Sequence, residues 1–197
     1  MFTWDSNGAI IAVSNSKLCK GNFIVQMEKV AKFHPDAIIL REKDMSPDEY
    51  RQIAIKVMDI CKKENVVCVL HSFVDIARKL ECEYIHVPLH VLVDNESIVQ
   101  EFKCVGVSVH SVDEARTAQN LGASYVTAGH VFATACKKGL PPRGTTFLRQ
   151  VCENVEIPVF GIGGMSLDKM EEVRKCGANG MCIMSGFMKD DFGEGKI

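Results

Sequence analysis

Several features that would mark other protein classes are missing from this sequence of 197 residues. No two of its nine cysteines have the C-x-x-C spacing of a zinc site or a redox pair, and an odd count does not suit a complete set of disulfides. Most of the cysteines lie within apolar runs such as Val66–Leu70, where a reduced thiol acts as a small hydrophobic side chain. The cysteine usage therefore indicates a reducing compartment.

Signals for large polyanionic partners and for membranes are also missing. The formal net charge is -2 and no run of Lys or Arg exceeds two residues, so a nucleic-acid partner is not expected. No apolar run approaches the length of a membrane span, and Met1–Asp5 carries no signal-peptide pattern. The sequence predicts a cytoplasmic protein without membrane or nucleic-acid partners. The net charge does not exclude a small phosphorylated ligand, because such a ligand requires only a local pocket.

What the chain does contain is an alternation of short apolar runs with longer amphipathic stretches. Hydrophobic residues make up 47% of the chain, enough for one sizeable core, and the length suits a single domain over residues 1–197. The apolar runs lack strict alternation, which is typical of parallel strands buried on both faces. The expected strands are Ala9–Val13, Ala37–Leu40, Val66–Leu70, Tyr84–Val87, Val105–Val109, Tyr125–Ala128, Val159–Ile162 and Gly180–Met184.

Three serines mark the starts of helices between these strands. Ser46 is followed by proline at the first helical position and glutamate at the third, the pattern of a capping box. Ser111 opens a second helix that stops at Gly122, and Ser166 opens a third that stops at Gly177. Strands that alternate with capped helices predict a parallel sheet.

Such a sheet is either an open doubly wound sheet or a closed barrel. No G-x-G-x-x-G follows the first strand, and polar residues come after nearly every strand instead of at one switch point. Both observations favour a compact (β/α)8 TIM barrel, in which these residues ring one mouth. After Phe187 too few residues remain for a full closing helix, so we expect an abbreviated last helix. The rest of the chain is then either a frayed tail or a flank covered by a partner chain, and a homodimer is one expectation.

Two glycine-containing turns suit a phosphate group. Gly163-Gly164 follows the seventh expected strand, and Ser185-Gly186 follows the eighth. Backbone N–H groups at such turns, together with a serine hydroxyl, donate to phosphate, and TIM barrels commonly bind phosphate after these two strands. The alternative is that the glycines only make tight turns.

His130 follows the sixth strand and begins an unusually long polar loop. Loops of this length in compact units are often lids, and Lys137 or Lys138 could close over an anion. A histidine at a strand end suits proton transfer, although such residues are often structural. His86 and His90 are four residues apart, but Pro88 lies between them and no convincing ligand set surrounds them, so no metal is expected. His71 and His110 are expected to line the mouth.

From Ile10 to Phe187 the chain resembles the superfamily of thiamine phosphate synthases and TenI-type thiazole tautomerases. The likeness is carried by five segments, and that superfamily has the barrel fold argued above. The segments are Leu40-Arg41-Glu42-Lys43-Asp44, Val74-Asp75-Ile76-Ala77, Ser108-Val109-His110-Ser111, Ile162-Gly163-Gly164 and the run from Gly129 to Gly139.

Within this resemblance the two branches differ at positions with a chemical role. The synthases hold Mg²⁺ with an Asn-Asp pair and a Gly-Gln-Glu-Asp segment, where this chain has His71-Ser72 and Pro88-Leu89-His90-Val91. A glutamine that reads the pyrimidine in the synthases corresponds to Ile39 here. Mg²⁺ prefers oxygen ligands to imidazole, so these replacements would remove most of its binding. The tautomerase pattern Gly-His-Val-Phe, followed by Thr-x-Cys-Lys-Lys-Gly, is present at Gly129–Gly139.

The resemblance therefore implies a thiazole tautomerase of thiamine biosynthesis, an isomerase without metal or cofactor. It carries over His130 as the catalytic residue and a carboxylated thiazole phosphate as the substrate. The expected phosphate-binding residues are Gly163, Gly164, Ser185 and Gly186, and the expected substrate-binding residues are Arg41, Lys43, Thr134 and Lys137. Two alternatives stay open: a thiamine phosphate synthase, which is a transferase, and a silent ligand-binding or regulatory barrel.

Overall fold

The computed structural model describes residues 8–137 and 139–189 and contains a closed eight-stranded parallel barrel. The strands are β1 (Ala9–Val13), β2 (Ala37–Leu40), β3 (Val67–His71), β4 (Tyr84–Pro88), β5 (Cys104–Val109), β6 (Tyr125–Gly129), β7 (Val159–Ile162) and β8 (Gly180–Ile183). Each strand pairs with the next one along the chain, and β8 pairs with β1 through the register Ile11 to Cys182. The predicted TIM barrel is confirmed, with strand ends that differ from the expected ones by one residue at most.

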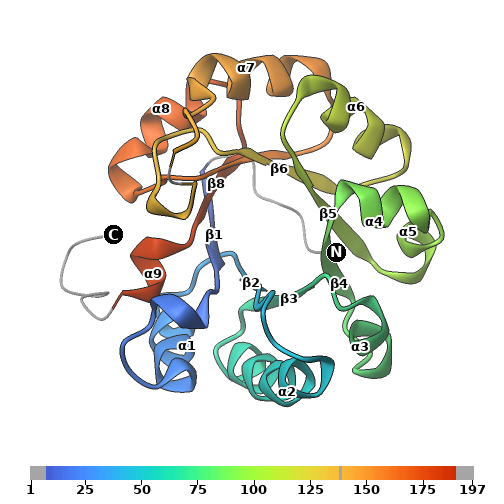
Figure 1. Cartoon of the computed structure of the whole chain (residues 1–197), viewed down its shortest axis with the longest axis vertical. Coiled ribbons are helices and arrows are strands. Elements are labelled where there is room, and N and C mark those ends of the chain that lie inside the picture. The colour runs from blue at the N-terminus through green and yellow to red at the C-terminus, as the bar shows by residue number, and fades with distance from the viewer. Residues whose placement is uncertain (1–7, 138, 190–197) are drawn as a thin grey trace.

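Helices surround the barrel on the outside (Figure 1). They are α1 (Phe23–Lys32), α2 (Pro47–Lys63), α3 (Val74–Lys79), α4 (Leu89–Asp94), α5 (Ile98–Glu101), α6 (Val112–Asn120), α7 (Gly144–Asn154), α8 (Met170–Arg174) and α9 (Ser185–Met188). The helix α9 has four residues, as the short last unit predicts, and residues 190–197 lie outside the described chain. The side-chain amide of Gln26 donates to the carbonyl of Phe187 at 2.6 Å and so fastens α9 to α1.

The expected helix starts are confirmed in two cases and changed in the third. Ser46 and Glu49 form the capping box of α2, and the hydroxyl of Ser111 accepts from the backbone N–H of Glu114. Ser166 makes no side-chain cap bond; a 3-10 turn, Leu167–Lys169, precedes α8 instead. No helix in the described ranges is long and apolar enough to cross a membrane.

Apolar side chains form two separate cores. The larger core lies between the strands and the surrounding helices, and the smaller one fills the barrel interior. Tyr125 and Phe160 are fully buried in the inner core, with ring centroids 5.6 Å apart in an edge-to-face arrangement. Gly106 makes room for Tyr125 and His86, because a Cβ atom there would lie 2.1 Å from the ring of Tyr125 and 2.5 Å from Nδ1 of His86. The inner core closes the bottom of the barrel and leaves its other end open.

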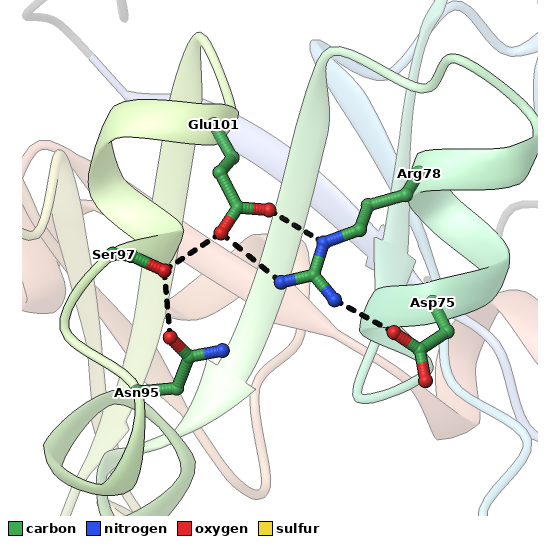
Figure 2. A network of polar contacts seen from close by, with 5 residues as sticks. All are labelled: Asp75, Arg78, Asn95, Ser97 and Glu101. Carbon is green, nitrogen blue, oxygen red and sulfur yellow. Dashed lines mark hydrogen bonds and ion pairs between the residues drawn. The ribbon is translucent and has the colours of Figure 1, made fainter.

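An ion-pair network joins α3 to α5 on the outer surface (Figure 2). The guanidinium of Arg78 donates from Nε and a terminal nitrogen to the two carboxylate oxygens of Glu101, at 2.5 and 3.0 Å, and it contacts Asp75 at 2.6 Å. The hydroxyl of Ser97 donates to Glu101 at 2.8 Å and lies 2.7 Å from the side-chain oxygen of Asn95. These groups are largely solvent-exposed, so the network orients α5 more than it stabilises the fold.

Candidate active site

A cavity of about 1020 Å³ opens at the carboxyl ends of the strands. The loops that follow the strands form its wall, as the sequence predicts for a barrel mouth. It brings together most of the expected site residues, namely Arg41, Lys43, His130, Thr134, Lys137, Gly163, Gly164 and Ser185. Gly186 lies next to Ser185 within α9 and is not among the lining residues, and Lys138 lies outside the described chain.

His130 stands at the cavity wall directly after β6. Its Nε2 atom is buried and has no hydrogen-bond partner among the described residues. The main chain around it is fixed on both sides, since the carbonyl of His130 accepts from Arg143 and the N–H of Val131 donates to Ile162 at 2.9 Å. His130 thus combines a place in the lining of a substrate-sized cavity with a buried nitrogen that lacks a protein partner among the described residues.

The glycines after β7 allow the loop of His130 to approach closely. Gly163 has φ +97°, and a Cβ atom there would lie 2.3 Å from the Cβ of His130. Gly164 has φ +64°, and a Cβ there would lie 2.4 Å from the carbonyl oxygen of Ala133. Both positions require glycine for conformation and for space. The need for a tight turn and a close approach therefore accounts for glycine at both positions. Phosphate binding by these residues is a separate proposal.

Three cationic side chains meet on one side of the cavity. Burial lowers the pKa of Arg41, an effect that the neighbouring Glu42 partly opposes. Burial also lowers the pKa of Lys43, and the positive charges of Arg41 and Lys137 lower it further. A bound anion would relieve the repulsion that Lys43 experiences from these two cations. This side of the cavity is suited to an anionic group.

A buried carboxylate that the sequence analysis did not single out supports this cationic side. Glu42 is 5% exposed and accepts hydrogen bonds from the hydroxyls of Ser14 and Ser16, both at 2.6 Å. The backbone N–H of Ser16 also donates to it at 2.9 Å, and the hydroxyl of Ser14 accepts from the N–H of Arg41 at 2.8 Å. The carboxylate thus joins the ends of β1 and β2. In the sequence Glu42 lies between Arg41 and Lys43, and that position could have indicated a role in the site.

Polar side chains also lie beneath the cavity, inside the barrel. The rings of His71 and His86 stack with centroids 5.5 Å apart. Nδ1 of His86 lies 3.1 Å from the hydroxyl of Tyr125, and Nε2 lies 2.8 Å from the hydroxyl of Ser108, which lines the cavity. Burial lowers the pKa of His86 to about 3, so this ring is neutral at physiological pH. Ser108 and Thr127 were not expected in the site. Their occurrence as polar residues within otherwise apolar strands was the feature of the sequence that could have indicated them.

The other acidic and histidine residues at the mouth either bind neighbouring protein groups or lie apart from one another. The N–H of His110 donates to the carboxylate of Glu114 at 2.6 Å, and Asp44 pairs with Lys17 at 2.6 Å. His86 is buried, whereas His90 is exposed on α4, so the two do not form one ligand pair. Within residues 8–137 and 139–189, no group of three or more His, Cys, Asp or Glu could hold a metal ion.

Comparison with known proteins places this barrel in a family. The family model described as thiamine monophosphate synthase matches residues 10–187. The chain belongs to this family. It is 33% identical over 189 residues to the thiamine-phosphate synthase of Caldanaerobacter subterraneus, covering 92% of this chain and 87% of the relative. It is 32% identical over 182 residues to the thiamine-phosphate synthase of Alkaliphilus oremlandii, covering 89% and 86%.

A solved structure agrees with this assignment at the level of the fold. The thiamine phosphate pyrophosphorylase of Pyrococcus furiosus superposes with a TM-score of 0.81 at 24% identity, covering 96% of this chain and 92% of the other. The superfamily expected from the sequence is confirmed. The names of these relatives agree better with the synthase alternative than with the tautomerase.

Proposed function

We propose that the protein is a thiazole tautomerase that converts a carboxylated thiazole phosphate from its exocyclic-alkene form to the aromatic form. The observation that carries the proposal is Nε2 of His130, which is buried at the cavity wall without a partner among the described residues. An imidazole can both accept and donate a proton near neutral pH.

In the proposed reaction His130 accepts the proton from ring carbon C2. The electron pair of that C–H bond enters the ring, and the exocyclic double bond takes up a proton at its outer carbon. His130 delivers that proton, so the two events leave the enzyme unchanged and make the ring aromatic. Proton transfer by a positioned side chain contributes about 10²- to 10⁴-fold to a rate.

The two ends of the substrate fit opposite parts of the cavity. We assign the phosphate to Gly163, Gly164 and Ser185, with Gly186 as a backbone contributor from α9. The carboxylate goes to the side of Arg41 and Lys43, where burial lowers the pKa of both cations and two further positive charges lower that of Lys43. Thr134 and Lys137, on the loop after His130, would close over the ligand.

A second candidate function is that of a thiamine-phosphate synthase, and the names of the relatives favour it. That reaction joins a pyrimidine pyrophosphate to a thiazole phosphate and needs Mg²⁺ to neutralise the leaving pyrophosphate. His71 and Ser72 stand where the resemblance places oxygen ligands for the metal, and the described residues contain no cluster of three or more His, Cys, Asp or Glu that could hold an ion. The replaced ligand positions are the reason that we propose proton transfer ahead of metal-dependent transfer.

One pair of assays distinguishes the candidates. The purified protein is given the carboxylated thiazole phosphate in its exocyclic form, and aromatisation is followed by ultraviolet absorbance. In parallel it is given both synthase substrates with Mg²⁺, and thiamine phosphate is measured by chromatography. We expect aromatisation without thiamine phosphate. Thiamine phosphate at ordinary enzyme rates would refute the tautomerase assignment, and turnover in neither assay would leave the silent ligand-binding barrel.

A further inference from the structure

His71 lies at the end of β3 and lines the same cavity as His130, although it is only 4% exposed. Three contacts hold the residue, two of them on its ring. The backbone N–H donates to the hydroxyl of Tyr50 at 2.9 Å, one ring face stacks on His86, and Nδ1 lies 2.7 Å from the hydroxyl of Ser72. Nδ1 is therefore the ring nitrogen that Ser72 engages.

The neighbouring Ser72 adopts a backbone conformation that favours glycine. Its φ is +66°, and this left-handed turn brings the hydroxyl to the Nδ1 atom of the preceding residue. Non-glycine residues in this region are uncommon, and such strain concentrates at binding and catalytic sites. When the Ser72 hydroxyl donates to Nδ1, the proton of a neutral His71 ring resides on Nε2.

The charges around His71 favour this neutral form. Burial, followed by the effects of His86, Arg41 and Lys43, holds the pKa of His71 well below its usual value. A buried neutral N–H donor beside two cations is complementary to a small anion and repels a further cation. In an eight-stranded closed barrel β3 lies opposite β7, so His71 faces the glycine turn assigned to the phosphate.

We propose that His71 is a substrate-binding residue, whose Nε2–H donates a hydrogen bond to the ring carboxylate of the thiazole, with Ser72 as its positioning residue. This proposal rests on the proposed tautomerase function and identifies His71 as the residue that recognises the carboxylate. When C2 loses its proton, negative charge spreads onto the attached carboxylate, and a fixed N–H donor stabilises it. A neutral imidazole supplies this stabilisation without giving up its own proton.

The test compares two ligands that differ only in the carboxylate. Titration calorimetry measures the dissociation constants of the aromatic carboxylated thiazole phosphate and of the thiazole phosphate that lacks the carboxylate. We expect the wild-type protein to bind the carboxylated ligand more tightly. His71→Leu removes the donor and keeps an apolar side chain, so the preference should fall by about 10- to 100-fold, the range for a hydrogen bond to a charged group.

Two further variants separate binding from structural support. His71→Gln keeps an N–H donor of similar reach and should retain most of the preference, whereas Ser72→Ala should lose part of it. Thermal melts show which variants fold. If His71→Leu and His71→Gln lose the preference equally, or if neither changes it, the carboxylate role of His71 is refuted.

Failure of this inference differs from failure of the proposed function. A wild-type protein that aromatises the substrate but binds both ligands equally would refute the role of His71 alone. A wild-type protein that binds neither ligand would refute both proposals.

Discussion

The hydroxyl of Ser14 donates to the carboxylate of Glu42 at 2.6 Å, and the same hydroxyl accepts from the backbone N–H of Arg41. One serine at the end of β1 therefore fixes both a buried carboxylate and the main chain of a cationic site residue. Both carboxylate oxygens of Glu42 act as hydrogen-bond acceptors in these contacts.

The first prediction concerns this carboxylate. Glu42→Gln replaces one acceptor oxygen by a donor that faces the hydroxyls and N–H of Ser14 and Ser16. We expect a loss of about 2–3 kcal/mol in the free energy of unfolding, the usual cost of leaving a buried charged-group bond unmade. The measurement is urea denaturation. The matched control is Asp44→Asn on the same loop, where the side chain is 69% exposed and the stability should not change measurably.

The second prediction concerns His130. His130→Asn removes the proton-transferring imidazole, and the rate of aromatisation should fall by about 10²- to 10⁴-fold. Binding of the aromatic product should change much less, because the phosphate and carboxylate contacts remain. Steady-state rates and product dissociation constants provide the two readouts. An unchanged rate in this variant would exclude His130 as the catalytic group.

The third prediction concerns the close approach at Gly163. Gly163→Ala forces a side chain into a left-handed backbone and into contact with His130 at the same time. We expect a loss of stability of about 1–3 kcal/mol together with a lower aromatisation rate. Gly139→Ala is the control, since Gly139 has φ +86° but no atom within 4 Å of an added Cβ. The control should show the backbone cost alone and keep the rate constant near that of wild type.

The fourth prediction is a pH dependence of stability. His71 and His86 both have pKa values that burial lowers, that of His86 to about 3, whereas an unfolded histidine titrates near 6.5. As the pH falls below about 6.5, the unfolded chain gains protons that the folded barrel does not, so the folded state loses stability. The slope is at most about 1.4 kcal/mol per pH unit for each histidine.

Denaturation curves between pH 7.5 and pH 5.5 test this dependence, because most carboxylates do not titrate there. In His86→Gln, about half of the slope should remain, contributed by His71. A stability that stays constant over this range in the wild-type protein would contradict neutral burial of both rings.

The fold was predictable because its signals are local. The apolar strands, the capping box at Ser46 and the glycine stop at Gly122 each follow from a few consecutive residues, and all appear in the structure. The expected side-chain cap at Ser166 is absent, because the residues that follow form a 3-10 turn and not the first turn of an α-helix.

The site was only partly predictable, because its inner layer depends on which strand residues point into the barrel. His130, Arg41 and Lys43 follow strands and could be recognised from that position. Ser108 lies within a strand, and its hydrogen bond to His86 joins residues 22 positions apart. Pairings of that kind depend on barrel register, which single-sequence patterns do not specify.

The position of β3 opposite β7 has a stereochemical consequence. A ligand that is bound by its carboxylate at one wall and by its phosphate at the other cannot reverse end for end, and the hydrogen on C2 that meets His130 is its third point of contact. His130 therefore meets only one face of the ring. In the exocyclic form C2 carries four different substituents, so only one mirror-image form presents its hydrogen to that imidazole. A racemic preparation should be consumed to half, and the unreacted enantiomer should remain in solution.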